Sequence, residues 1–141
     1  MANKRSKQRP ENTSRFLAPQ SVEIRESPNR GLGVFAVTDI AAGTTIERAP
    51  VLEFPTNDLY SPAGTALIAS YVFARSAKTV GLTLGFGSLY NHSWSPNATY
   101  EDLPGNVKHF YAVSPIKAGD EITINYNGAV DDESPVGFCV L

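Results

Sequence analysis

Two polar segments carry the residue types that could do chemistry. Tyr90–Asn97 places asparagine, histidine and serine side chains in a turn that follows an apolar run. Gly119–Gly128 begins as an acidic turn, continues as an alternating strand and ends in a tyrosine, Tyr126, just before another turn. An amide that both donates and accepts hydrogen bonds, an imidazole and a phenol presented at a strand end indicate a functional site.

The residues by themselves exclude several reactions but do not select one. No serine or cysteine has a base and an orienting acid placed by pattern, so triad hydrolysis is unsupported. Asp120 and Glu121 would point to opposite faces of a strand, which argues against paired-carboxylate chemistry. A lone histidine such as His92 is more often structural than catalytic. Tyr126 shares the face of Ile122 and Ile124, so a buried structural tyrosine is the alternative interpretation.

A glycine-containing turn, Arg30–Gly33, lies between two expected strands. Its two glycines lack Cβ atoms, so a ligand could lie against the backbone there. No helix is expected after this turn, and it is therefore not a dinucleotide-binding fingerprint. By itself such a segment is more often an ordinary turn than a ligand site.

The elements that must position these residues are mainly short strands separated by Pro and Gly, which predicts one mainly β domain of several small sheets. The chain has 141 residues and is 42% hydrophobic and 18% charged, as expected for one globular domain. Strands are expected at Val22–Arg25, Val34–Val37, Thr44–Glu47, Val51–Phe54, Ala98–Tyr100, Val107–Val113 and Glu121–Tyr126, with a short or bulged one at Gly81–Gly85. A short helix is expected within Ala63–Ala74, before an extended Tyr71–Phe73.

Charge is unevenly distributed along the chain. Residues 1–30 carry seven Lys/Arg and three Asp/Glu, a net charge of +4, whereas residues 31–141 carry five and eleven, a net charge of −6. We interpret residues 1–20 as a flexible basic tail. The acidic body argues against direct nucleic-acid binding and favours cationic ligands or peptides.

Composition also bounds the compartment and the cofactors. No apolar run approaches the length of a membrane span, and no secretory signal is visible. Cys139 is the single cysteine, so no internal disulfide and no Cys/His zinc site are expected; we interpret it as a small buried hydrophobe. These features favour a cytoplasmic protein, or a nuclear or chromatin-associated one if the source is eukaryotic. A homodimer is possible.

Three motifs in order resemble the SET-domain family of protein-lysine methyltransferases. They are Arg30–Ala36, then Asn91–Ser93 with Pro96 and Asn97, then Gly119–Thr123 followed by Tyr126 and Gly128. Each motif is modest, but the three together are specific. The resemblance runs from about Val22 to the C-terminus and is greatest to the small stand-alone SET proteins of bacteria and viruses. It assigns residues 21–141 to one SET domain, with 129–141 as a short C-terminal cap.

The resemblance implies a pseudoknotted, β-clip-like fold in which the C-terminal segment passes under a loop near Asn91–Ser93. It also implies S-adenosyl-L-methionine as the cofactor and a lysine-bearing protein, such as a histone or another basic protein, as the substrate. Tyr126 would be the catalytic tyrosine. The substrate channel would be lined by Tyr100, Ile124 and Tyr126, and the cofactor would be bound by Arg30, Gly31, Leu32, Gly33, Asn91, His92, Tyr71 and Phe138.

The chain also departs from the family pattern. It lacks the cysteine-rich zinc segment that follows the core in many nuclear members, and its short tail would cap the site with Phe138 instead. Gly137 stands where small bacterial relatives tend to have a bulky aromatic residue, which predicts a less complete lid. Ile124 occupies a position where an aromatic residue often controls how many methyl groups are added, so limited methylation is expected.

Two other readings remain open from the sequence. One is a SET-like binding or regulatory module that does little or no chemistry. The other is a β-rich peptide or carbohydrate binder whose motifs match by coincidence. The intact Asn91, His92 and Tyr126 favour the enzyme.

Overall fold

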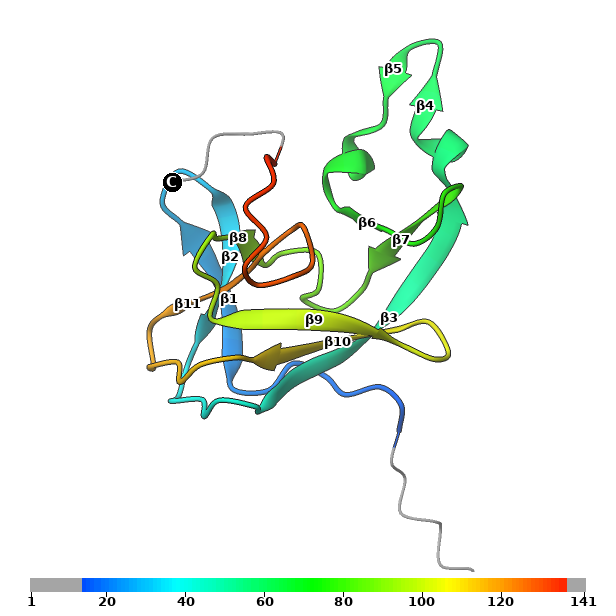
Figure 1. Ribbon diagram of the computed structural model, residues 1–141. Helices are drawn as coiled ribbons and strands as arrows, with labels where there is room; N and C mark the ends of the chain where they lie inside the picture. Colours follow the sequence, from blue (N-terminus) through cyan, green and yellow to red (C-terminus); the bar gives the residue numbers. More distant parts are fainter. Residues whose placement is uncertain (1–13, 137–141) are drawn as a thin grey trace, which may run out of the picture.

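The computed structural model describes residues 14–136, and β-strands dominate this part of the chain (Figure 1). The strands are β1 (Val22–Ser27), β2 (Gly31–Ala36), β3 (Thr45–Pro55), β4 (Tyr60–Ser61), β5 (Gly64–Thr65), β6 (Val72–Ala74), β7 (Thr79–Thr83), β8 (Asn91–His92), β9 (Ala98–Leu103), β10 (Val107–Ala112) and β11 (Glu121–Ile124). Two short 3₁₀ helices, η1 (Thr56–Leu59) and η2 (Leu67–Ser70), complete the described elements. The predicted mainly β architecture with one or two short helices is confirmed.

The strands form three small sheets. The first has the order β1-β2-β11-β8, the second β6-β7-β3-β10-β9, and the third is the β4-β5 ribbon, which projects from the body at the upper right of Figure 1. In the first sheet β11 pairs antiparallel with β2 and parallel with β8. A strand from near the C-terminus therefore lies between an N-terminal hairpin and the strand that carries Asn91 and His92.

Two tight turns explain the hairpins of these sheets. The β1–β2 turn contains Asn29 and Gly31, both with positive φ (61° and 74°). The β9–β10 turn contains Gly105 and Asn106, with φ of 83° and 57°. Left-handed residues at a tight turn, consecutive only at Gly105 and Asn106, reverse the chain between antiparallel strands, and Gly and Asn adopt this conformation at the lowest cost.

The main core is packed between the two larger sheets. Val34, Ile46, Phe110, Ile122 and Ile124 are all fully buried there. They come from β2, β3, β10 and β11, so the alternating pattern of these strands delivers one apolar face each to the same volume. This packing fixes β11, and with it the segment that carries Tyr126.

Several boundaries differ from those expected. Thr45–Glu47 and Val51–Phe54 belong to one long strand, β3, which pairs with β10 up to Pro50 and with β7 from Val51 onward. The helix expected within Ala63–Ala74 is reduced to the 3₁₀ turn η2, which buries none of its residues and so gains little from packing. The last strand ends at Ile124, before Tyr126.

The chain contacts the body earlier than the boundary expected at residue 21. Leu17 forms two backbone hydrogen bonds of 3.0 Å with Arg48 of β3, and the N–H of Gln20 donates to the carbonyl of Ile46. The expectations for Gly137, Phe138 and Cys139 concern residues outside the described range.

Candidate active site

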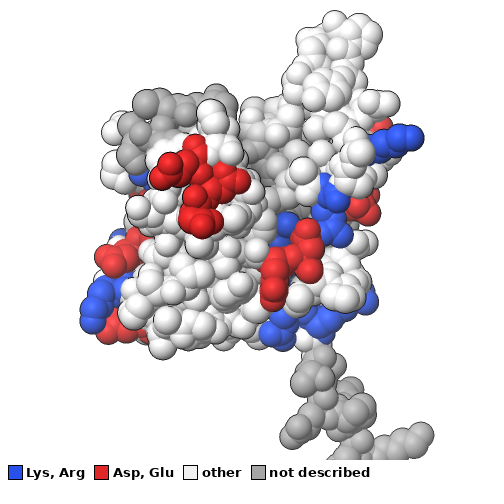
Figure 2. Space-filling model, in the orientation of Figure 1, with Lys and Arg blue, Asp and Glu red and all other residues white. Residues whose placement is uncertain are grey.

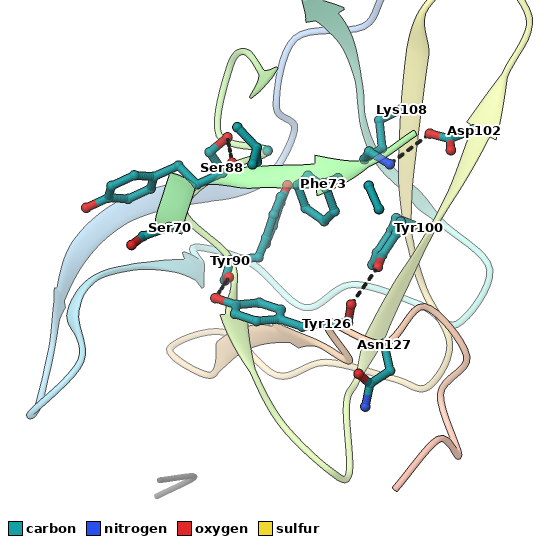
Figure 3. Close-up of a pocket in the computed structure, with 13 residues that line it drawn as sticks. Ser70, Phe73, Ser88, Tyr90, Tyr100, Asp102, Lys108, Tyr126 and Asn127 are labelled. Carbon is teal, nitrogen blue, oxygen red and sulfur yellow. Dashed lines mark hydrogen bonds and ion pairs between the residues drawn. The ribbon is translucent and has the colours of Figure 1, made fainter. Parts of the chain in front are cut away.

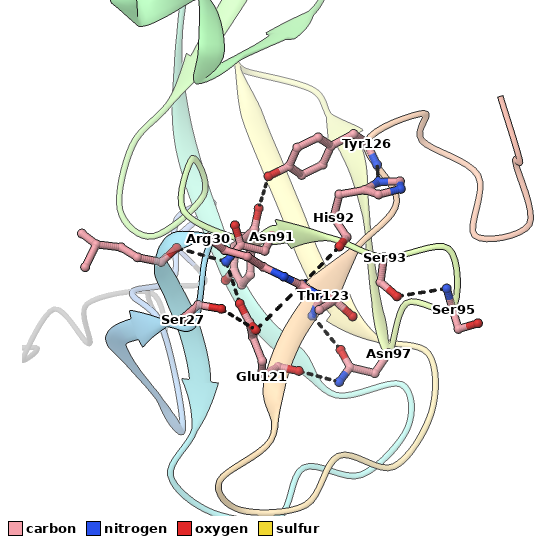
Figure 4. Close-up of polar contacts among 12 residues, drawn as sticks. Ser27, Arg30, Asn91, His92, Ser93, Ser95, Asn97, Glu121, Thr123 and Tyr126 are labelled. Atoms are coloured by element: carbon pink, nitrogen blue, oxygen red, sulfur yellow. Dashed lines mark hydrogen bonds and ion pairs between the residues drawn. The ribbon is translucent and has the colours of Figure 1, made fainter. Parts of the chain in front are cut away.

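The carboxylate of Glu121, the first residue of β11, joins three elements (Figure 4). Its Oε1 accepts a 2.6 Å hydrogen bond from Nδ2 of Asn91, and its Oε2 accepts one of 3.0 Å from the hydroxyl of Ser27. Arg30 lies 4.0 Å away as an ion-pair partner. The β1–β2 turn, β8 and β11 are therefore held together by one half-buried charge with several partners.

The glycine turn is attached to β8 through Asn91. Nδ2 of Asn91 donates to the carbonyl of Leu32 at 3.0 Å, so both amide hydrogens are used within the protein. A Cβ on Gly33 would lie 3.0 Å from this nitrogen and would clash with Glu121, whereas a Cβ on Gly31 would meet open space. The two glycines thus have different functions: one permits a left-handed backbone, and the other permits close packing.

His92 is buried and accepts a 3.0 Å hydrogen bond from the backbone N–H of Tyr126 at its Nδ1. Burial, with the nearby Arg30 charge, lowers the pKa of this imidazole below its ordinary value. Because Nδ1 accepts, the neutral ring carries its proton on Nε2. The edge of Trp94 packs against it at 4.4 Å between ring centroids. His92 is therefore a neutral residue that fixes the backbone at Tyr126.

Tyr126 is fixed both at its hydroxyl and at its backbone N–H. Its hydroxyl donates a 2.7 Å hydrogen bond to the main-chain carbonyl of Tyr90, while its backbone is fixed by His92. Burial and the carboxylate of Glu121 raise the pKa of Tyr126 above its ordinary value. The hydroxyl is therefore protonated at neutral pH and acts as a hydrogen-bond donor and dipole, not as a base.

Asn97 fixes the register of β11 from the other side. Its Oδ1 accepts from the backbone N–H of Thr123 at 2.9 Å, and its Nδ2 donates to the carbonyl of Glu121 at 2.8 Å. A side-chain amide thereby replaces a strand partner at this edge. Asn97 therefore attaches the segment 93–97 to β11 beside the site.

An aromatic cavity of about 280 Å³ lies on the side of Tyr126 where β6, β9 and β10 meet (Figure 3). Its wall includes Tyr71, Phe73, Tyr90, Tyr100, Lys108 and Tyr126. The ring of Tyr100 packs edge-on against Phe73 at 5.0 Å, and its hydroxyl donates to the carbonyl of Tyr126 at 3.3 Å. Burial raises the pKa of Tyr100 to about 12, so its phenol is uncharged at neutral pH.

One cation is built into the cavity wall. Lys108 is almost fully buried, and its Nζ lies 2.7 Å from Oδ1 of Asp102 and 4.4 Å and 4.7 Å from the ring centroids of Phe73 and Tyr100. Arg75 binds the same carboxylate at 2.8 Å. Burial lowers the pKa of Lys108, while Asp102 opposes that effect. The ring faces and the ion pair together compensate the cost of burying the ammonium group.

The structure brings most of the residues expected at the site together. The Arg30–Gly33 turn, Asn91, His92 and Tyr126 form one polar cluster, and Tyr100 lines the adjoining cavity. Tyr71, which we expected beside the cofactor, also lines this cavity. Ile124 is fully buried in the core and is not among the cavity residues.

Three residues that organise the site were not assigned to it from the sequence: Glu121, Tyr90 and Glu47. In the sequence Glu121 stands out only as the neighbour of Asp120 and as a member of the Gly119–Thr123 motif. Glu47 is fully buried, and its carboxylate binds the Tyr90 hydroxyl at 2.7 Å. The sequence signal for Glu47 is its place directly after Ile46 in an expected strand. If such an acid is buried, it needs a hydrogen-bonding partner.

The family of the protein follows from its fold and from its site, in which a polar cluster and an aromatic cavity meet at Tyr126. A family model described as the SET domain matches residues 31–127. The chain therefore belongs to the SET-domain family, and it is a protein-lysine methyltransferase.

Individual relatives agree with this class. The chain is 35% identical over 106 residues to the "Histone-lysine N-methyltransferase, H3 lysine-37 specific" of Schizosaccharomyces pombe, covering 74% of this chain and 72% of that protein. It is also similar to a crystal structure of a Plasmodium falciparum protein proposed to be a histone methyltransferase. That match has a TM-score of 0.63 and 32% identity, and it covers 76% of this chain and 93% of the other. Among the described residues, no helix is long and apolar enough to cross a membrane.

Proposed function

We propose that the protein transfers a methyl group from S-adenosyl-L-methionine to the side-chain amine of a lysine in a histone, with Tyr126 as the catalytic tyrosine. The observation that carries this proposal is the position of Tyr126, which belongs both to the polar cluster and to the aromatic cavity. A group held by the cluster and a lysine entering the cavity would meet at this phenol.

The residues of the polar cluster fit the cofactor. The carbonyls of Leu32, His92 and Tyr90, which accept hydrogen bonds from Asn91, Arg30 and Tyr126, lie in this cluster, and a carbonyl oxygen can accept two hydrogen bonds. The space beside Gly31 is open. Carbonyl oxygens and the face of Tyr126 suit a cationic sulfonium, and Arg30 suits a carboxylate. When bound, the cofactor supplies an electrophilic methyl group.

The aromatic cavity fits the target lysine. An amine with a pKa near 10.4 is only about 0.04% neutral at pH 7, a cost of about 4.6 kcal/mol. Loss of water contacts in the cavity disfavours the ammonium form, and the resident cation Lys108 adds like charge. The proton can leave to solvent before the transfer, so no side chain has to act as a base. The remaining contribution of the protein is alignment of the reacting atoms.

The charge of the body favours a basic substrate. Residues 31–141 have a net charge of −6. Figure 2 shows, on one face, one compact group of acidic side chains over the segment that follows β11, whereas a second group, over β9, lies beside Lys and Arg side chains. Such a face attracts a lysine- and arginine-rich segment. Together with the identity to the histone-lysine enzyme of S. pombe, this favours histone H3 as the substrate and, in a eukaryotic cell, a nuclear location.

Incubation with S-adenosyl-L-methionine and core histones, followed by peptide mass spectrometry, tests the proposal. The expected result is methylation of defined lysines on histone H3. Calorimetry with the cofactor alone is the companion measurement. Binding without transfer to histones would indicate a regulatory module instead, and absence of binding would overturn the cofactor assignment.

A further inference from the structure

Glu47, in the middle of β3, is a buried acid with no place in the chemistry described above. Its side chain is about 1% exposed. Its two oxygens have separate partners: Oε1 accepts a 2.7 Å hydrogen bond from the hydroxyl of Tyr90, and Oε2 accepts one of 3.3 Å from the backbone N–H of Phe86. The carboxylate therefore fastens both ends of the segment 86–90 to the core sheet.

This segment forms part of the cavity wall. Gly87, Ser88 and Tyr90 all line the cavity. The turn before it fits closely around the acid, because a Cβ on Gly85, whose φ is +63°, would lie 2.7 Å from Oε2 of Glu47. Removing the carboxylate would release the segment from β3 at two points.

The segment ends at the group that holds Tyr126. The carbonyl of Tyr90 accepts the hydroxyl of Tyr126 at 2.7 Å. The Tyr90 ring is stacked on Phe110 at 4.5 Å, so its position depends on the core and on Glu47 together. A continuous series of contacts therefore runs from Glu47 through Tyr90 to the phenol.

We propose that Glu47 is a positioning residue that fixes the Tyr126 hydroxyl through Tyr90 and the segment 86–90. The role in catalysis rests on the proposed function, whereas the effect on the position of Tyr126 does not. The ionised carboxylate accepts from both donors at once. A protonated carboxyl or a carboxamide presents a donor at one end, so its bond to Tyr90 persists only if the Tyr90 hydroxyl reverses its role and accepts, which changes the geometry of this contact.

The ionisation of Glu47 supports this geometry and gives it a pH dependence. Burial raises its pKa to about 7, against the opposing hydrogen bonds from Tyr90 and Phe86. The charged groups at neighbouring positions of β3 and β10 are directed to other partners. Arg48 donates to the carbonyls of Ser14 and Arg15, Lys108 binds Asp102, and His109 contacts Thr45 and Glu101.

The test compares wild type, Glu47→Gln and the control Glu23→Gln, whose exposed carboxylate pairs with Arg25, two residues along the same strand. Glutamine has the shape of the acid but imitates its protonated form. The ratio of wild-type to variant kcat is measured with histone H3 from about pH 6 to about pH 8.5. Taking the ratio cancels the deprotonation of the substrate lysine, which is common to both proteins. In parallel, the ¹³Cζ resonance of Tyr126, assigned with Tyr126→Phe, is followed over the same range.

We expect the ratio for Glu47→Gln to rise from near one to about tenfold as the pH passes through about 7, in kcat rather than in KM. The Tyr126 resonance should change over the same interval in wild type and Glu23→Gln but not in Glu47→Gln. A ratio that is independent of pH, or an unchanged resonance, would overturn the proposal. If wild type transfers no methyl group, the proposed function fails, and the resonance alone decides on the positioning of Tyr126.

A second variant keeps the proposal testable if Glu47→Gln does not fold. Tyr90→Phe removes the hydroxyl that binds Glu47 but keeps the ring stack and the main-chain carbonyl. We expect it to lower kcat and to abolish the pH dependence of the Tyr126 resonance. A Tyr90→Phe protein with the wild-type kcat and the wild-type resonance profile would also contradict the proposal.

Discussion

The hydroxyl of Tyr126 is bound at 2.7 Å by the main-chain carbonyl of Tyr90, although the two residues lie on different segments. Because the acceptor is a backbone atom, the orientation of the phenol depends on the position of the main chain at residue 90. The backbone N–H of Tyr126 is fixed independently by His92. Two separate attachments therefore orient the phenol between the polar cluster and the aromatic cavity.

Substituting Gly33 by alanine should weaken cofactor binding. The new Cβ would clash with the carboxylate of Glu121 and crowd Nδ2 of Asn91, which would displace the glycine turn from β8. We expect the Kd for S-adenosyl-L-methionine in calorimetry to rise by about tenfold or more, the equivalent of about 1.4 kcal/mol.

The matched control for this variant is Gly43→Ala. Gly43 also lies in a turn, has φ +82° and would place its Cβ in open space. It should lose about 1 kcal/mol of stability through backbone strain and leave the Kd unchanged. Equal Kd values for Gly33→Ala and wild type would contradict the assigned role of the turn.

Replacing Asn97 by alanine should destabilise the whole domain. Two hydrogen bonds to the backbone of β11 would be lost, leaving a donor and an acceptor unsatisfied at a half-buried edge. The free energy of unfolding in urea should fall by about 2–3 kcal/mol. Asn57→Ala, at an exposed position of η1, should stay within about 0.5 kcal/mol. Similar losses in both variants would show that Asn97 does not hold β11.

His92 should remain neutral at physiological pH. Its pKa is lowered from the ordinary 6.5 by burial and by Arg30, so the folded state resists protonation. Stability from this group is present above about pH 6.5 and is lost as the pH falls toward the lower folded pKa. Nitrogen-15 NMR should find the proton on Nε2 and a titration midpoint below 6.5. A midpoint above 6.5, or a proton on Nδ1, would disagree with the bond from Tyr126.

Glu47 should give stability the opposite dependence on pH. Its folded pKa is raised from 4.5 to about 7, so its contribution is complete below pH 4.5 and is lost as the pH rises through about 7. The shift corresponds to about 3 kcal/mol. As the pH rises from about 4.5 to above about 7, the unfolding free energy of wild type should therefore fall by about 3 kcal/mol relative to that of Glu47→Gln. A difference that stays constant with pH would mean that Glu47 titrates normally.

Sequence patterns located the polar cluster but not its internal contacts. Asn91, His92 and Tyr126 could be placed because their motifs are local and their order is specific. The contacts of Glu121 with Ser27 and Asn91 join positions that are far apart in the chain, and no local pattern encodes such pairs. Ile124 illustrates the converse. Its expected place in the substrate channel came from a position in the family, whereas here the alternation of β11 directs it into the core.

Some element boundaries expected from the sequence also differ from those in the structure, because contacts between distant segments decide them. Pro50 favoured two strands, but its missing N–H is tolerated because it lies where β3 changes its partner from β10 to β7, and the strand continues through it. Residues 63–74 have apolar spacing compatible with a helix, yet η2 finds no surface to pack against. Tertiary pairing overrode local preference in both places.

The most direct test of the central claim is the rate of lysine methylation by Tyr126→Phe. The substitution removes one hydroxyl, while the ring and the backbone bond to His92 can remain. Tyr111→Phe, on β10 outside the cavity, is the control for loss of a phenol. With histone H3 and S-adenosyl-L-methionine, Tyr126→Phe should lose about 100-fold or more in kcat while keeping its thermal stability, and Tyr111→Phe should match wild type. Equal rates in Tyr126→Phe and wild type would contradict the assignment of Tyr126 as the catalytic residue.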